Sequence, residues 1–139
     1  MTKTVKNYVS MIHFGEYEKW NRNTKKLPNI KKITDEILAE IDTEFGYTLL
    51  IKQQKGKTLN FVIEHPPFTD ESGEISPAFT GELIIPQNTY RFYLGDCIWA
   101  PLDDKLGAWR LITYIENTLV ADKTLFLKDK NSTEFDLDW

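Results

Sequence analysis

The chain has 139 residues, a formal net charge of −4 and one cysteine. This length favours a single domain with its own core, and the excess of acidic residues argues against a nucleic-acid partner, which usually meets a basic face. A lone cysteine cannot form an internal disulfide, and residues 1–14 lack an apolar run of the length that a signal peptide or a membrane span requires. We therefore expect a cytoplasmic protein that binds neither nucleic acid nor membrane.

Alternating apolar and polar residues, interrupted by turn residues, predict β-strands along most of the chain. The first expected strand is Tyr8–Tyr17, and a basic, loop-like segment, Trp20–Asn29, follows it. In Ile30–Ile41 the apolar residues have helical spacing, but the surrounding chain is β throughout. For this segment we favour an extended or irregular structure, with one short helix as the alternative. Phe79–Ile85 is a further expected strand.

Residues 45–54 and 58–65 each alternate, and a glycine-containing turn lies between them. A three-residue loop that ends at Gly56 would place Ile51 opposite Leu59, so that the apolar residues of both segments share one face. The last position of such a loop requires a positive φ, which costs least at glycine. The pattern therefore predicts a β-hairpin.

The stretch from Tyr90 to Leu111 is dense in aromatic residues and is the expected centre of the core. We expect its first strand to end at Gly95 and Asp96, and a second short strand to form at Ile98–Trp99. Aspartate at such a turn accepts hydrogen bonds from the backbone amides that follow it. A structural role at this turn is therefore the favoured interpretation of Asp96. Trp99 and Trp109 are both expected in the core.

The segments Trp109–Ile115 and Leu119–Leu127 predict a last hairpin across Asn117, with an undetermined register because both parities leave a polar residue on an apolar face. Residues 1–127 are then a single β-sandwich domain of seven to nine antiparallel strands in two packed sheets. Residues 128–139 are expected to be an acidic tail or an extra edge strand.

The side chains that often perform chemistry have no catalytic or metal-binding spacing in this sequence. The acidic loop Asp70–Glu74 lacks the ligand spacing of an EF-hand, which favours a solvated turn. His13 and His65 are far apart, and neither has a partner at the spacing of a zinc motif. Cys97 follows an aspartate that would raise the thiol pKa, so we interpret it as a packing residue. We expect no catalytic residue, metal or cofactor.

Aromatic and acidic side chains around the dense stretch are the candidate binding residues. Aromatic rings bring a large contact area at low entropy cost, and carboxylates would form a polar rim. The candidates are Trp20, Tyr90, Tyr93, Asp96, Asp103 and Asp104. For Trp20 and Tyr93, partial burial as ordinary structural residues is an equally weighted alternative.

Several runs of the sequence together resemble an uncharacterised bacterial family. These runs are TEFGY, GKTLNFVIEHPP, NTYRFYLGDCIWAPLDDKLGAWRL and DKTLFL, within Gly15 to Leu127. The most specific part of the likeness extends from Tyr93 to Trp109. The resemblance implies a domain of unknown function with an immunoglobulin-like β-sandwich, and it implies no activity. The helical spacing at residues 30–41 departs from this pattern.

The absence of a recognisable catalytic pattern favours a non-catalytic interaction module. Such a domain would bind a protein or a peptide through an exposed edge strand or an aromatic face. The alternative from another class is carbohydrate binding on an aromatic sheet face, which would require coplanar, exposed rings. A hydrolase is the residual alternative, and it would require His13 or His65 to meet a carboxylate in a cleft.

Overall fold

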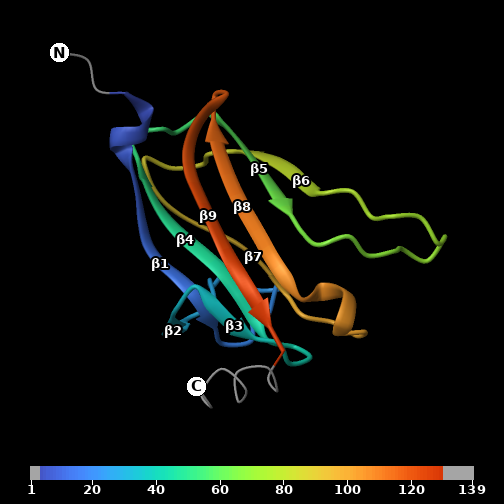
Figure 1. Ribbon diagram of the computed structural model, residues 1–139. Helices are drawn as coiled ribbons and strands as arrows, with labels where there is room; N and C mark the ends of the chain where they lie inside the picture. The colour runs from blue at the N-terminus through green and yellow to red at the C-terminus, as the bar shows by residue number, and fades with distance from the viewer. Residues whose placement is uncertain (1–3, 130–139) are drawn as a thin grey trace, which may run out of the picture.

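The computed structural model describes residues 4–129, which form a sandwich of two β-sheets (Figure 1). Within these residues the nine strands are β1 (Val9–Tyr17), β2 (Ile30–Ile33), β3 (Glu36–Leu38), β4 (Glu44–Lys52), β5 (Thr58–Glu64), β6 (Phe79–Ile84), β7 (Thr89–Cys97), β8 (Gly107–Ile115) and β9 (Thr118–Lys128). Two 3₁₀ turns, η1 (Val5–Tyr8) and η2 (Asp103–Lys105), accompany them. The expected all-β sandwich is therefore confirmed.

Sheet A has the strand order β2-β1-β4-β7, and sheet B has the order β3-β9-β8-β5-β6. The pairs are antiparallel except for β3 and β9, which run parallel. The segment between β5 and β6, residues 65–78, projects from one end of the sandwich (Figure 1). Within the described residues no helix has the length and apolar character that a membrane crossing requires.

The core lies between the inner faces of the two sheets, where β4 faces β8. Phe45 on β4 meets Trp109 on β8 edge to face, with ring centroids 5.2 Å apart, and each is 1% exposed. The Tyr47 hydroxyl forms a hydrogen bond across the core with the Thr113 hydroxyl. Burial raises the pKa of Tyr47 well above its ordinary value. Trp109 therefore occupies the expected core position.

The expected hairpin of residues 45–65 does not form, because its two strands belong to different sheets. Ile51 on β4 lies opposite Val9 and Tyr90, whereas Leu59 on β5 lies opposite Leu83 and Ile115. Alternation shows only that one face of each strand is buried. Two strands that face each other across a sandwich satisfy this pattern as well as two hairpin strands do.

The connection from β4 to β5 crosses between the sheets beside the connection from β6 to β7. Its Gln53 amide donates to the Asn88 carbonyl, and its Gly56 amide donates to the Ile85 carbonyl. Gly56 has the positive φ expected of it, at 86°. The turn residue was therefore identified correctly, and the two crossing connections stabilise each other with main-chain hydrogen bonds.

Strand β7 does not end at Gly95 and Asp96 as expected but continues to Cys97. Three glycines lie side by side across sheet A, since Gly46 on β4 pairs with both Gly15 on β1 and Gly95 on β7. A Cβ atom at Gly95 would lie 2.2 Å from the Phe45 carbonyl oxygen and 2.2 Å from the Tyr93 hydroxyl. Gly95 therefore marks a close approach within a strand, and it is not a strand breaker.

The second short strand expected at Ile98–Trp99 is also absent, and Trp99 is 36% exposed. Its ring covers the ammonium of Lys105, which lies 4.6 Å from the Trp99 ring centroid and 4.8 Å from that of Phe68. Lys105 itself is 2% exposed, and its ammonium donates to Asp104 and to the Pro101 carbonyl. Trp99 thus shields a buried cation at the end of the sandwich.

Residues 30–41 form two short strands, β2 and β3, as the favoured extended interpretation predicts, and contain no helix. Ile37 is fully buried, but Ile33 and Ile41 are 62% and 56% exposed, so the helical spacing does not produce a buried stripe.

The hairpin of β8 and β9 forms across Asn117 as expected. A register shift between Thr113 and Tyr114 explains why no uniform pairing of the two strands kept every polar residue off the apolar face.

The expected tail, residues 128–139, begins with Lys128, which is the last residue of β9. Residues 130–139 lie outside the described part of the chain. The interpretation of this segment as a tail or an extra edge strand therefore stays a prediction.

We predict that Gly95→Ala destabilises the fold by about 3 kcal/mol, because the added methyl group would clash with the Phe45 carbonyl oxygen. The matched control is Gly56→Ala, where the space is open and only the positive φ is costly, by about 1 kcal/mol. Urea denaturation of both variants measures the difference. Equal losses of stability would show that the glycine row is not a packing constraint.

Candidate functional site

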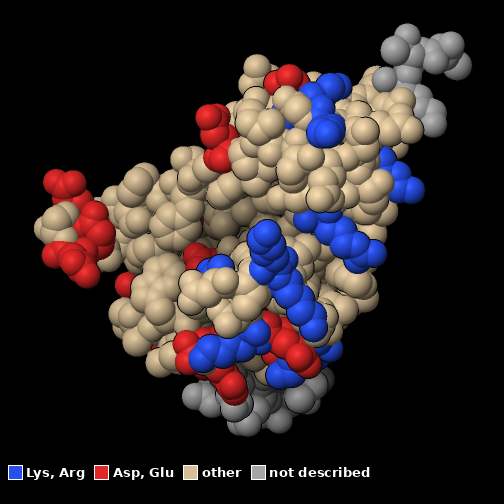
Figure 2. Space-filling model, turned by 180° about the vertical axis from the view of Figure 1, so that it is seen from behind, with Lys and Arg blue, Asp and Glu red and all other residues tan. Residues whose placement is uncertain are grey.

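The two sheets have different widths, and the difference leaves a cleft on one side of the sandwich. Sheet A ends at β7, whereas sheet B continues past β5 to β6. The inner-face residues of β6, Phe79, Gly81 and Leu83, are only half-buried. A cleft of about 330 Å³ opens beside them. Figure 2 shows the surface hollowed next to the projecting segment 65–78, whose tip carries acidic side chains.

The residues that line the cleft come from three strands and from the loop after β1. They are Trp20, Arg22, Phe61, Ile63, Phe79, Phe92, Tyr93, Leu94, Gly95 and Asp96. The apolar floor forms because the odd-numbered residues of β5 and the even-numbered residues of β7 both point inward. Phe61 and Phe92 meet there with their ring centroids 6.1 Å apart.

One wall of the cleft is the loop that carries Trp20 and Arg22. The Trp20 indole donates to the Lys26 carbonyl over 2.9 Å, and the Asn21 side chain accepts from the Asn23 amide. These local bonds fold the loop back on itself. The Arg22 guanidinium lies 4.6 Å from the Trp20 ring centroid, a cation–π contact that aligns the two side chains.

A buried carboxylate attaches this loop to sheet A. Glu44 is 2% exposed and accepts two hydrogen bonds from Arg22, at 3.0 and 2.8 Å. The Tyr93 hydroxyl lies 2.5 Å from the same carboxylate and 3.0 Å from the Phe45 carbonyl oxygen. Burial and the negative charge of Glu44 raise the pKa of Tyr93 well above its ordinary value. The wall is therefore fixed by paired groups that share one carboxylate.

Asp96 lies at the end of the cleft. Its Oδ1 accepts a hydrogen bond of 2.8 Å from the Cys97 amide, which agrees with the expected bond to a following amide, although no turn forms. Asp96 forms no ion pair with any residue between 4 and 129. Burial raises the pKa of this carboxyl group. It is therefore a half-buried acid with a local backbone contact and no cation bound to it.

The backbone of β7 is open along the cleft. The Ile98 amide donates to the Thr43 carbonyl and the Gln53 amide donates to the Asn88 carbonyl, so the even-numbered residues at both ends of β7 bond toward the β4 side. The odd-numbered residues between them, Arg91, Tyr93 and Gly95, must then direct their amides away from β4. No strand of the described chain pairs with that edge.

Three of the six predicted binding residues, Trp20, Tyr93 and Asp96, meet at this cleft. Tyr90 lies half-buried on β7 and packs against the core, and Asp103 and Asp104 lie in η2, where Asp104 pairs with Lys105. Sequence reasoning missed Arg22 and the phenylalanines of β5, β6 and β7. The only signal for Arg22 was its position two residues after Trp20, within a segment that is typical of a solvated loop.

The rings do not form a flat sugar-binding platform. Trp20 and Tyr93 meet edge to face with an interplanar angle of 82°, and Tyr93 is 6% exposed. Coplanar, exposed rings were the feature expected of a carbohydrate site. Trp20 and Tyr93 therefore lack the geometry that was expected of a carbohydrate site.

Two of the side chains considered for catalysis, His65 and Cys97, have the following surroundings. The two ring nitrogens of His65 lie 2.7 and 2.8 Å from the carbonyl oxygens of Pro66 and Pro77, and the ring stacks on Phe68. Burial, and then the charges of Glu44 and Asp96, raise the pKa of the half-buried Cys97. Among residues 4–129, no group of three His, Cys, Asp or Glu side chains is placed to hold a metal ion.

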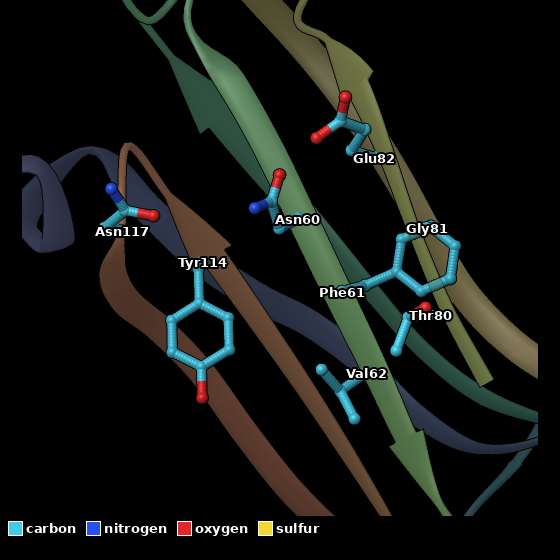
Figure 3. A pocket seen from close by; sticks show the side chains of 8 residues that line it. All are labelled: Asn60, Phe61, Val62, Thr80, Gly81, Glu82, Tyr114 and Asn117. Carbon is cyan, nitrogen blue, oxygen red and sulfur yellow. The ribbon is translucent and has the colours of Figure 1, made fainter. Parts of the chain in front are cut away.

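A larger hollow of about 530 Å³ lies over β8, β5 and β6 (Figure 3). It is lined by Asn60, Phe61, Val62, Thr80, Gly81, Glu82, Tyr114 and Asn117. Figure 3 shows the Phe61 ring lying across Gly81, where a Cβ atom would be 2.4 Å from the ring. The buried Oδ1 of Asn60 has no hydrogen-bond partner among the described residues. β5, which crosses the middle of this hollow, is paired on both sides.

A family model for a domain of unknown function, DUF3859, matches residues 5–126. The chain belongs to this family. A solved immunoglobulin-like protein from Pseudomonas aeruginosa matches this DUF3859 domain with a TM-score of 0.68 and 20% identity, over 86% of this chain and 96% of that one. The resemblance inferred from the sequence, and the immunoglobulin-like fold that it implied, are thereby confirmed.

A second solved structure, the alkylpurine DNA glycosylase AlkC of Pseudomonas fluorescens bound to DNA with an abasic-site analogue, aligns with 87% of this chain. The TM-score is 0.37 and the identity 12%, and the alignment covers 30% of the glycosylase chain. No curated protein matches the sequence.

We predict that Asp96→Asn is at least as stable as the wild type at pH 7, because asparagine keeps an acceptor for the Cys97 amide and removes a charge that burial disfavours. Below the raised pKa of Asp96, and down to the ordinary value of 3.8, the folded wild type binds a proton that the unfolded chain does not bind. The wild type should therefore gain stability relative to Asp96→Asn as the pH falls through this window.

Urea denaturation at several pH values measures this difference. The charged or titratable groups that face Asp96 are Arg22, Glu44 and His65, and all three are unchanged in the variant. A wild type that is the more stable protein at pH 7, and that loses this advantage in acid, would contradict the predicted sign.

Proposed function

We propose that this domain is a non-catalytic interaction module that binds an extended segment of a partner protein as an added strand on β7. The single observation that carries the proposal is the missing fifth strand of sheet A beside the uncovered inner face of β6. A strand added to β7 would pair with the outward amides of Arg91, Tyr93 and Gly95, and it would cover the apolar floor of the cleft.

Comparison of the four edge strands also supports β7 as the binding edge. Natural edges are usually short, or they carry lysine, proline or bulges that prevent pairing. β2 has four residues, including Lys31 and Lys32, and a register shift interrupts its pairing with β1. β3 has three residues, and β6 has six. β7 has nine residues without lysine or proline, and its ladder with β4 has no register shift.

The rigid wall at one side of the cleft is a further argument for peptide binding. Trp20 and Arg22 are already held in place by Tyr93 and Glu44. A groove whose side chains are fixed before binding loses little entropy when a ligand enters. A hydrolytic function has no comparable support, because the ring nitrogens of His65 face main-chain carbonyl oxygens.

We predict that Arg91→Pro abolishes this binding and leaves the fold stable to within about 1 kcal/mol. Proline removes an amide that points away from β4, so the ladder between β4 and β7 stays complete. Arg91→Ala is the matched control, since it removes the same side chain and keeps the amide.

A displayed library of random heptapeptides, selected on the wild-type domain, provides the probe. Enriched peptides should bind Arg91→Ala like the wild type and bind Arg91→Pro at least about tenfold more weakly, as expected for a lost hydrogen bond in a desolvated edge. Enriched peptides that bind both variants equally, or a library that yields no binder, would refute strand addition on β7.

A further inference from the structure

The cleft contains one charged group that the fold does not neutralise. Asp96 points to the inner face of the sandwich, as Phe92 and Leu94 do, and its Oδ1 is occupied by the Cys97 amide. Its Oδ2 accepts no hydrogen bond from the residues that the structure describes. A carboxylate on the apolar face of a sheet is costly unless a cation or a donor reaches it.

Neither of the basic residues near Asp96, Arg22 and His65, donates a hydrogen bond to it. The Arg22 guanidinium binds the Glu44 carboxylate through two hydrogen bonds, which satisfies its charge elsewhere. The His65 ring nitrogens face the carbonyl oxygens of Pro66 and Pro77. The carboxylate is therefore available to a group that enters the cleft from outside.

We propose that the segment bound by β7 carries a lysine or arginine that pairs with Asp96, followed by apolar residues two and four positions further along. This inference rests on the proposed function and specifies the chemistry of its partner. All strand pairs of sheet A are antiparallel, so the added strand is assigned the same direction. Read from its amino end, the partner segment passes Asp96, then Leu94, then Phe92.

The register follows from the free amides of β7. The odd-numbered residues Arg91, Tyr93 and Gly95 form the hydrogen-bonded pairs with an added strand, so Leu94 and Asp96 lie in non-hydrogen-bonded pairs. In such pairs the Cα atoms are only about 4.5 Å apart and the side chains approach most closely. A cation opposite Asp96 can therefore reach its Oδ2, and an apolar side chain opposite Leu94 enters the cleft.

The surroundings of the cleft also favour a basic partner. Asp70, Glu71 and Glu74 lie at the tip of the projecting segment, where the Asp70 amide donates to the Glu74 carbonyl, and Figure 2 shows acidic side chains there. These side chains are exposed, so they would attract a basic segment through long-range electrostatic interactions, which added salt weakens. The charge of the whole chain, −4, has the same sign.

The test uses three labelled heptapeptides and fluorescence anisotropy with the full chain. The first is Thr-Lys-Thr-Leu-Thr-Leu-Thr, the second replaces Lys by Glu, and the third reverses the order to Thr-Leu-Thr-Leu-Thr-Lys-Thr. We expect the wild type to bind the first peptide at least about tenfold more tightly than the other two, the scale of one charge-assisted hydrogen bond. Asp96→Asn should lose most of this preference, and Asp96→Lys should favour the Glu peptide.

Asp103→Asn is the matched control, because it removes an exposed carboxylate of η2 outside the cleft and should bind like the wild type. Equal binding of all three peptides, with loss of binding in Arg91→Pro, would refute the cation contact and retain strand addition. No binding of the Lys peptide at about 1 mM would refute both proposals. Light scattering that shows a wild-type dimer and an Arg91→Pro monomer would instead identify a second copy of this chain as the occupant.

Discussion

Sheet A has four strands and sheet B has five, and this difference in width determines where the cleft lies. A sandwich buries its apolar faces only where a strand of one sheet lies over a strand of the other. β6 has no such partner, and the consequence is visible in its half-buried inner face. The cleft, its aromatic floor and the open edge of β7 all follow from this one missing strand. The same feature explains why Phe61, which contacts the buried Phe92, is itself only half-buried.

The glycine row and the buried Glu44 together hold the region beside this gap. Gly95 leaves room for the Tyr93 ring to lie along the outer face of the sheet, where its hydroxyl reaches Glu44. Glu44 in turn binds Arg22 and so fixes the loop after β1. An ion pair with one buried partner contributes little net stability, because desolvation of the carboxylate offsets the attraction. Its effect is positional, since it determines where the Trp20 side chain lies.

The sequence predicted the element types well and their neighbours less well. Alternation located the strands, and the positive φ of Gly56 was expected, but the same alternation suits a hairpin and a crossing between sheets. Gly95 suggested a strand end, because the sequence does not distinguish a glycine in a turn from a glycine in a strand that lacks space for a Cβ atom. Trp99 was assigned to the core from its residue type. Its actual contact, with the buried Lys105, depends on tertiary structure and cannot be read from the sequence. At the cleft, Trp20, Tyr93 and Asp96 had been selected by residue type, whereas the position of Arg22 depends on a glutamate that is distant in sequence.

The edge strands of the two sheets differ in length and charge, and this difference has a consequence for self-assembly. An edge that pairs with a different edge on the next copy adds copies without limit and produces fibres, whereas an edge that pairs with itself across a two-fold axis closes at two. β2 and β3 are too short or too charged to accept a long neighbour, and β6 has six residues against the nine of β7, so the edge that matches β7 over its full length is another β7. Copies of this chain that associated through β7 would form a symmetric pair and stop there. An open β7 edge of this kind would therefore not by itself make the chain a template for polymerisation.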